Sequence, residues 1–403
     1  MSMELTLADT KKIHLHNMLL LEPPETRSAV DIITKLGYVQ LDTIYVTARS
    51  QDLVLHSRSL SYQEKDVWID HQNQRLLEEF AHARSLIPLS EFPYYYRKML
   101  LRRNSKPKWF EMVKQPEDLI ARTLQLVREE GEITTSDVPV NQEFTSNWSG
   151  LNKRVLDYLT LRGFTHVKRR ENFSTVYYGL LEDIIPDIPE EDELPSRMEV
   201  FWHDIYTTLD NHGIVPFHRL LHYTYSQRTF RYNNKRQSPR RMVKKAIDEG
   251  KIEEHQVAGT DIPYYSRPGY LVNTDLPNLE EPQVFLLSPF DNVMWSREAL
   301  EDQYQFQYKF EGYTPKKKRK YGFYSLPILY GIDFVGRVDT KLDRSSQTMM
   351  FKQWTWESAF QPTTHFWDRL AITISRFLSF HQATATDWGD LDPVYRKELT
   401  DRL

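Results

Sequence analysis

The sequence contains no cysteine among its 403 residues. This absence excludes a disulfide framework, a cysteine-ligated zinc site, an iron–sulfur cluster and a cysteine nucleophile. Long apolar runs are missing as well, because no segment approaches the roughly 18–20 continuous apolar residues of a membrane helix. The first residues show neither the basic start nor the small-residue cleavage site of a signal peptide. We therefore expect a cytoplasmic protein.

The composition is otherwise that of an ordinary globular protein, with 40% hydrophobic and 27% charged residues. The length predicts two to four domains. The formal net charge is −4, but the charges are segregated along the chain. Residues 97–108, 228–245 and 316–320 carry basic side chains and no acid, whereas seven acids lie within 182–193. Basic stripes on an acidic body are typical of a protein that holds DNA along one face, and solvated surface charge explains any single stripe equally well.

One local pattern occurs three times along the chain, in residues 28–42, 151–178 and 239–270. In each copy a helical stretch ends at a glycine and runs directly into an alternating or aromatic-rich extended segment. The three glycines stand where a helix requires a left-handed residue after its last turn, and they are Gly37, Gly163 and Gly250. The pattern therefore predicts three similar helix-and-strand units.

The segment upstream of the second copy identifies the kind of unit. Pro116 opens an amphipathic helix that Gly131 closes, and Thr134 or Thr135 is placed to cap a short helix. Helix, short helix, helix and two-stranded wing is the order of a winged helix-turn-helix domain. In the first copy the wing is not obvious from the sequence.

From about residue 281 the pattern becomes β-rich, with alternating or apolar runs in 283–295, 304–315, 321–343 and 348–357 and a closing helix at about 363–380. The acidic, proline-containing stretch 183–195 is typical of a linker. We predict an α+β fold of tandem winged helix-turn-helix units with a C-terminal antiparallel β-barrel-like domain. The predicted domains are three winged-helix domains at 1–112, 113–188 and 189–278 and the β-rich domain with its closing helix at 279–403.

The segment 36–49 contains the candidate for chemistry. Residues two apart in a strand face the same side, so Gln40 and Asp42 project together while Val39 and Leu41 face the core. A carboxylate can stabilise a developing oxocarbenium ion or deprotonate water, and an amide can position that water. By pattern alone, a solvent-facing polar pair is the simpler explanation.

Several separated motifs, in order, resemble the winged-helix DNA glycosylase family typified by AlkZ and by AlkX, also called YcaQ. The matching segments cover nearly the whole chain and are 36–44, 78–88, 168–177, 286–301, 313–331 and 335–344. The family signature is Gln, an apolar residue, then Gln or Asp, and here Gln40-Leu41-Asp42 resembles the AlkX branch. Carried over by position, Asp42 is the catalytic carboxylate and Gln40 is its partner. Tyr45 and Phe80 depart from the residues common in the family, which bears on substrate range.

The resemblance implies a monofunctional DNA glycosylase that hydrolyses the N-glycosidic bond of N7-alkylated purines and unhooks interstrand crosslinks. Water is the expected attacker, because the catalytic strand has no lysine to form a Schiff base. We expect no metal and no cofactor. The expected partner is double-stranded DNA with alkylated or crosslinked purines. The protein is expected to be a monomer that is nucleoid-associated when bound to DNA. The alternatives are a winged-helix transcription regulator without catalysis and an architectural DNA-binding protein with a vestigial pair.

Several further residues are candidates for DNA contact. The basic run 315–320 lies between two β-patterned segments, which favours a hairpin or loop that grips phosphates over a nuclear import signal. His82 lies in a family motif and is equally explained by packing. Asp291 and Asn292 are expected to form a turn. The residues assigned to DNA contact are Thr43, Arg49, His82, Lys153, Arg154, Arg169, Arg170, Lys316, Lys317, Lys318, Arg319, Lys320 and Tyr321.

Overall fold

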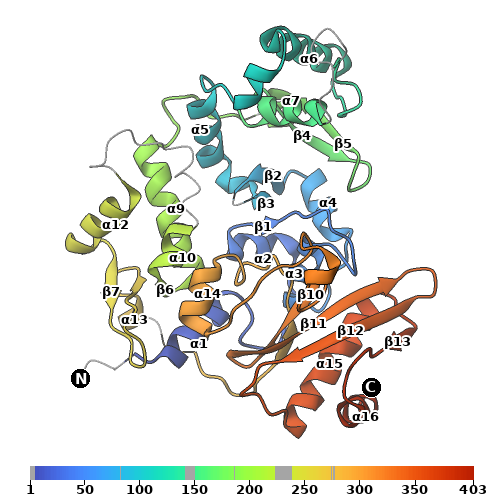
Figure 1. Cartoon of the computed structure of the whole chain (residues 1–403). Coiled ribbons are helices and arrows are strands. Elements are labelled where there is room, and N and C mark those ends of the chain that lie inside the picture. Colours follow the sequence, from blue (N-terminus) through green and yellow to red (C-terminus); the bar gives the residue numbers. More distant parts are fainter. Residues whose placement is uncertain are drawn as a thin grey trace. The chain divides into compact units, whose positions relative to one another are not determined.

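The computed structural model describes residues 5–81, 83–140, 150–185, 187–222, 238–273, 275 and 277–403 (Figure 1). By internal contacts the chain divides into two compact units. Unit 1 comprises Met1–Val67, Ile205–Thr224 and Tyr232–Leu403, and unit 2 comprises Trp68–Asp204 and Tyr225–Arg231. This division does not test the boundaries of the four predicted domains, which stay predictions. Within the described residues, no helix combines the length and apolar character needed to cross a membrane.

Unit 1 combines helices from the N-terminal, middle and C-terminal parts of the chain with a C-terminal sheet. Its helices are α1 (Leu7–Asn17), α2 (Ala29–Leu36), α3 (Ser50–Arg58), α10 (Phe217–His222), α12 (Pro239–Asp248), α13 (Tyr270–Asn273), α14 (Arg297–Tyr304), α15 (Thr364–Phe380) and α16 (Pro393–Thr400). Its strands are β1 (Val39–Gln40), β6 (Val215–Pro216), β7 (Glu253–His255), β8 (Tyr264–Ser266), β9 (Val284–Leu286), β10 (Ser325–Tyr330), β11 (Asp333–Asp343), β12 (Thr348–Trp356) and β13 (Ala385–Asp387). Two helices, α4 (Asp66–Gln72) and α9 (Arg197–His212), contribute residues to both units.

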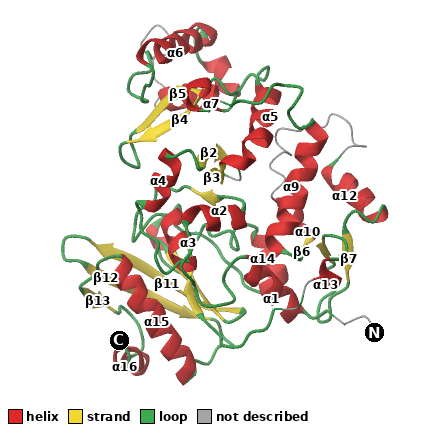
Figure 2. Cartoon of the chain, turned by 180° about the vertical axis from the view of Figure 1, so that it is seen from behind, coloured by secondary structure: helices red, strands yellow, loops and turns green. Residues whose placement is uncertain are grey.

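The C-terminal sheet has the order β13-β12-β11-β10-β9. Its pairs are antiparallel except β12 with β13, and the long β11–β12 hairpin runs from Gly336 opposite Trp356 to Asp343 opposite Thr348. The helix α15 lies along one face of this sheet in both views (Figures 1 and 2). Phe366, Leu370 and Ile374 of α15 are fully buried in the shared core. Each such side chain contributes about 1.5–3 kcal/mol when it leaves water.

The predicted β-rich region is thus confirmed, as an open five-stranded sheet rather than a closed barrel. The predicted closing helix is confirmed as α15, whose first N–H groups are capped by the Thr363 hydroxyl accepting from Phe366 N. One expected strand is wrong, because residues 305–310 form no ladder. Phe306 and Tyr308 are nevertheless buried while Gln305, Gln307 and Lys309 are exposed, so the alternation of that segment reflects burial without strand pairing.

The three repeated patterns form the expected local elements. The helices α2, α7 (Leu151–Thr160) and α12 precede Gly37, Gly163 and Gly250, whose φ angles are 81°, 68° and 69°. Such angles are strained for residues with a Cβ atom. A short strand follows the first glycine, and a two-stranded hairpin follows each of the other two.

Unit 2 contains the second of these patterns. Its elements are β2 (Leu76–Phe80), β3 (Arg84–Pro88), η1 (Leu89–Glu91), α5 (Phe92–Arg102), η2 (Lys108–Met112), α6 (Pro116–Glu130), α7, β4 (Thr165–Arg170), β5 (Val176–Leu180) and α8 (Leu181–Ile184). The helices α6 and α7 and the β4–β5 hairpin share one apolar core. The predicted short helix at Thr134 is wrong: residues 135–137 form a turn, in which the Asp137 carboxylate accepts from Thr134 N and Oγ1. This contact is the one found at helix starts, but no helical turn continues it in residues 138–140.

Candidate active site

The strand that carries the candidate pair is shorter than predicted. It ends at Gln40, and Asp42 lies in the loop beyond it. Val39, Gln40 and Leu41 are all buried, with exposed fractions of 0%, 9% and 7%, so the predicted alternation of faces does not hold. The Asp42 Oδ1 atom accepts a 2.8 Å hydrogen bond from Ile44 N, a turn that a short carboxylate side chain favours. The Asp42 side chain is therefore held by the loop that follows the strand.

The surroundings of Asp42 shift the acid–base equilibrium of its carboxyl group. Burial raises the pKa of the Asp42 carboxyl, and the Ile44 N–H group offsets only part of that effect. The charge of Asp42 also acts on Tyr324, a fully buried phenol whose pKa is raised mainly by its own burial. A carboxylate whose pKa lies above the usual range is a stronger base near neutral pH. This environment suits a group that removes a proton from water.

The segment before Asp42 is anchored by residues about 250 positions later in the chain. The fully buried Asn292 Nδ2 donates to Tyr38 O at 2.8 Å, and the Tyr38 ring stacks on Trp295 at 4.2 Å between centroids. Asp291 does lie in the expected turn, with its N–H group on Ser288 O. Its carboxylate also forms a fully buried, bidentate ion pair with Arg58 at 2.7 and 2.9 Å. The sequence interpretation found the turn and missed both anchoring roles.

A second carboxyl group, Asp52, was not predicted from the sequence. It lies in the first turn of α3, is 2% exposed and accepts a 2.7 Å hydrogen bond from the Tyr62 hydroxyl. Burial raises the pKa of Asp52 to about 7. Its charge, like that of Asp42, raises the pKa of Tyr324. Acids are frequent in first helical turns, so the sequence offers no signal that separates Asp52 from an ordinary helix-end residue.

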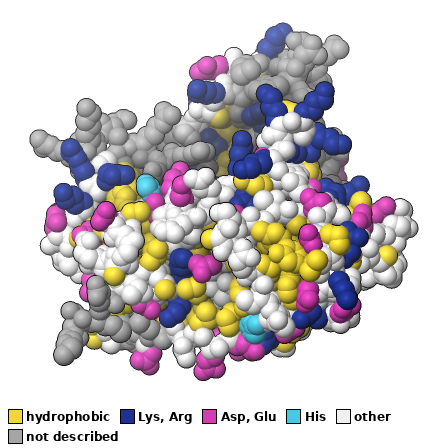
Figure 3. All heavy atoms as spheres, turned by 60° about the horizontal axis from the view of Figure 1, so that its bottom comes forward, with side chains coloured by type: hydrophobic (Ala, Val, Ile, Leu, Met, Phe, Trp, Pro, Cys, Tyr) yellow, Lys and Arg dark blue, Asp and Glu magenta, His cyan; other side chains and the backbone are white. Residues whose placement is uncertain are grey.

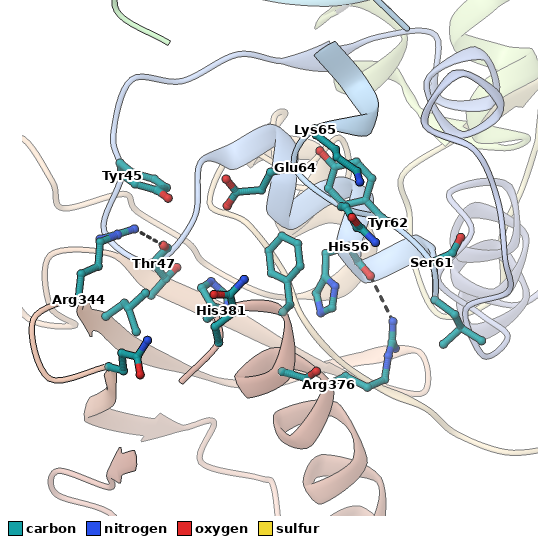
Figure 4. Close-up of a pocket in the computed structure, with 17 residues that line it drawn as sticks. Tyr45, Thr47, His56, Ser61, Tyr62, Glu64, Lys65, Arg344, Arg376 and His381 are labelled. Atoms are coloured by element: carbon teal, nitrogen blue, oxygen red, sulfur yellow. Dashed lines mark hydrogen bonds between the residues drawn. The ribbon is translucent and has the colours of Figure 1, made fainter. Parts of the chain in front are cut away.

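A cavity of about 970 Å³ adjoins the loop that follows Asp42 (Figure 4). Tyr45 and Thr47 of this loop lie in its wall. The guanidinium groups of Arg49 and Arg344 lie 4.2 and 3.8 Å from the centroid of the Tyr45 ring. Of the two residues expected to contact DNA here, Thr43 is exposed and Arg49 is half-buried against Tyr45. Whether either contacts DNA stays a prediction.

The predicted DNA-contact residues of unit 2 are mostly matched with acids. Lys153 pairs with Asp157 at 2.6 Å, and Arg169 pairs with Glu132 while its guanidinium lies over Tyr177. Arg154 is exposed. These pairings leave the predicted DNA contacts of unit 2 untested.

Arg170 of the same set is engaged inside unit 2. It donates to the fully buried Glu78 and to Phe173 O. Burial alone would raise the pKa of Glu78, but the hydrogen bond and charge of Arg170 lower it to about 2. Arg170 therefore neutralises a buried acid of its own unit.

The basic run 316–320 forms the expected loop, with a 3-10 turn at Lys316–Lys318. The Glu311 carboxylate accepts from the backbone N–H groups of Lys320 and Tyr321, and Arg319 donates to Thr314 O. The exposed lysines are Lys316, Lys317, Lys318 and Lys320, and among the described residues none has an ion-pair partner. The loop therefore presents uncompensated positive charge.

Two further predictions concern His82, which was assigned to DNA contact, and the expected absence of a metal site. His82 lies outside the described residues. Among the histidine, aspartate and glutamate side chains that the structure describes, no group of three or more is placed to hold a metal ion. On the face shown in Figure 3, basic and acidic side chains are interspersed with apolar ones.

Comparison with known proteins identifies the family. The family model of AlkZ-like DNA glycosylases matches residues 33–380, which include Gln40, Asp42 and the walls of the cavity up to Arg376 and Phe380. Among solved structures, the chain is similar to the DNA glycosylase AlkZ of Streptomyces sahachiroi, with a TM-score of 0.63 and 16% identity over 96% of this chain and 99% of that chain. That likeness shows a shared mixed α+β fold. With most of its length matched by the family model, the chain belongs to the family of AlkZ-like DNA glycosylases.

Proposed function

We propose that this protein is a monofunctional DNA glycosylase that hydrolyses the N-glycosidic bond of N7-alkylated purines and unhooks interstrand crosslinks through them. Family membership supports glycosylase chemistry. The raised pKa of the buried Asp42 carboxyl supports hydrolysis by an activated water molecule. The proposal includes the interpretation of the three helix–glycine–strand units as winged helices that hold DNA.

The observation that carries the proposal is the Asp42 carboxyl itself. One oxygen accepts from Ile44 N, and no partner of the other is found among the described residues. Burial raises the pKa of this carboxyl, which makes it a better base. The Gln40 side chain, which is 9% exposed, forms no hydrogen bond within the described part of the chain and is available to orient a water molecule.

The substrate class follows from what the site supplies. An N7-alkylated guanine carries a positive charge, so its base leaves with the electron pair of the glycosidic bond and needs no acid. The water oxygen forms a bond to C1′, the C1′–N9 bond breaks, and Asp42 takes the proton of the water. Before that transfer, its negative charge stabilises the developing sugar cation. One carboxylate is sufficient for both steps.

The direct test is release of free base from a duplex with a single N7-methylguanine, measured by mass spectrometry. We expect Asp42→Asn to lower the rate by about 10²–10⁴, the usual contribution of a general base, while DNA affinity measured by fluorescence anisotropy persists. Asp31→Asn is the matched control, because Asp31 is an exposed carboxylate that engages Ser28 at the start of α2. It should release base at the wild-type rate.

A duplex crosslinked by a nitrogen mustard tests the second half of the proposal on denaturing gels. Unhooking that requires Asp42 supports it. DNA binding without base release from either substrate, alike in wild type and Asp42→Asn, would overturn the enzymatic function and favour a winged-helix regulator.

A further inference from the structure

The cavity beside the Asp42 loop is large enough for more than a water cluster. Its volume is about 970 Å³, at the upper end of the range of about 300–1,000 Å³ for ligand pockets. Four segments of unit 1 form its walls: the loop with Tyr45 and Thr47, the stretch from His56 to Lys65, the β11–β12 turn and the C-terminal end of α15 (Figure 4).

Two arginines in these walls have no acidic partner. Arg344 donates through Nη2 to Thr47 O at 2.5 Å, and Arg376 donates through Nη2 to His56 O and Ser59 O at 3.3 Å each. Within the described residues neither forms an ion pair, and no partner is found for their remaining N–H donors. The backbone thus fixes both guanidinium groups and leaves their charge for a ligand. Guanidinium donors match phosphate oxygens well.

The charge of the cavity is positive. Lys65 adds a third cation, and Glu64 is the one acid among the described lining residues. The histidines do not add to this charge near neutral pH, because burial lowers the pKa of His56 to about 3 and that of His381 to about 4. The cavity therefore suits an anion with few charges.

Part of the wall is flat, uncharged and aromatic. The His56 ring stacks on Phe380 at 4.3 Å between centroids, and the Tyr62 ring lies close to Phe380. The His381 ring is held in place by a 2.7 Å hydrogen bond from Nδ1 to Phe377 O. A planar base matches such a wall by stacking.

We propose that this cavity binds an unpaired nucleotide of the DNA, with the flanking phosphates on Arg344 and Arg376 and the base against the His56–Phe380 wall. This inference rests on the proposed function in taking DNA as the ligand. The first residue of the cavity wall, Tyr45, comes three positions after Asp42 in the sequence, and Val46 O of the same loop accepts from Leu342 N of β11 at 3.1 Å. A nucleotide bound there keeps the DNA open next to the bond that is cleaved.

The test compares two fluorescein-labelled duplexes that differ in a single unpaired thymidine. We expect Arg344→Gln with Arg376→Gln to weaken binding of the bulged duplex about tenfold and that of the paired duplex less than threefold. The slope of log affinity against log salt should fall by about 1.4 for the bulged duplex, since each single-strand phosphate contact contributes about 0.7. Arg369→Gln is the matched control on α15, because Arg369 is paired with Glu281.

A second measurement does not depend on the variants. Ultraviolet crosslinking of wild-type protein to a duplex with 4-thiothymidine at the unpaired position should label peptides that contain residues 56–65 or 377–382. Equal loss of affinity for both duplexes, no loss for either, or labelling elsewhere would overturn the inference. A different result would refute the proposed function alone. In that case the wild type releases no base from an N7-methylguanine duplex, but the arginine substitutions still weaken binding of the bulged duplex.

Discussion

The buried ion pair between Arg58 and Asp291 gives the sharpest prediction about stability. Both side chains are fully buried, and the two carboxylate oxygens meet the guanidinium at 2.7 and 2.9 Å. The other guanidinium donors are also satisfied, on Met18 O, Val54 O and Ser57 Oγ. Removing the carboxylate therefore leaves a buried cation whose charge nothing else in this hydrogen-bond set compensates.

We expect Asp291→Leu to lower the free energy of unfolding by about 3–5 kcal/mol, the usual cost of an uncompensated buried charge. In a domain of roughly 150–250 residues each kcal/mol shifts the melting temperature by about 2–4 °C, so the expected shift is about 10 °C. Adding Arg58→Met should restore more than half of the loss, because replacing both charges of a buried pair with apolar groups is often nearly neutral.

The assay is urea unfolding followed by circular dichroism, with Asp368→Asn as the control. Asp368 pairs with Arg402 at 2.6 Å, but its side chain is 53% exposed, so its loss should cost less than about 1 kcal/mol. An Asp291→Leu variant within about 1 kcal/mol of wild type, or a double variant less stable than both single ones, would refute the reasoning.

Two further predictions concern Asp52 and Gly322. Burial raises the pKa of Asp52 to about 7, so the contribution of its protonated form to stability is full below about pH 4 and is lost as the pH rises to about 7. In urea unfolding, the free energy of unfolding of wild type relative to Asp52→Asn should therefore be lower at pH 7.5 than at pH 4.5, by an amount on the order of a few kcal/mol. Equal differences at both pH values would contradict this. Gly322 has φ +110°, and a Cβ atom there would lie 2.2 Å from Cγ of Asp339, which is held by Lys352. Gly322→Ala should therefore be more destabilising than Gly259→Ala, which has φ +90° and open space, by about 1–3 kcal/mol, the usual cost of overpacking. Equal melting temperatures would show that the Asp339 contact yields.

Local patterns in the sequence predicted local structure well. The three glycines that end helices, the helix α15 with its Thr363 cap and the strands of the C-terminal sheet all follow from periodicity and backbone chemistry within about 20 residues. Where these predictions failed, the local pattern was present but did not continue into the expected helix or strand. The alternation of 305–310 reflects burial on a surface without a neighbouring strand, and the Thr134 segment forms an aspartate-stabilised turn.

The contacts that hold the candidate site in place could not be predicted from local patterns, because they join distant parts of the chain. The hydrogen bond from Asn292 to Tyr38 spans 254 positions, and the ion pair of Arg58 with Asp291 spans 233. Neither contact has a sequence signature, since each partner alone resembles a turn or a helix-end residue. The burial that raises the pKa of Asp52 also exists only after the chain has folded.

These long-range contacts explain why the N-terminal motif depends on the C-terminal sheet. Besides Asn292, the β11 backbone binds Val46 O, Arg344 of the β11–β12 turn binds Thr47 O, and the Ser50 and Ser288 hydroxyls meet at 2.8 Å. The loop with Asp42 is therefore clamped on both sides by residues 288–344. The Asp42 hydrogen bond to Ile44, by contrast, lies within the loop and does not involve the sheet. Changes in the β11–β12 turn should consequently alter what fits beside Asp42 while leaving its carboxylate in place. Under the proposed function, this separates selection of the substrate from the chemistry.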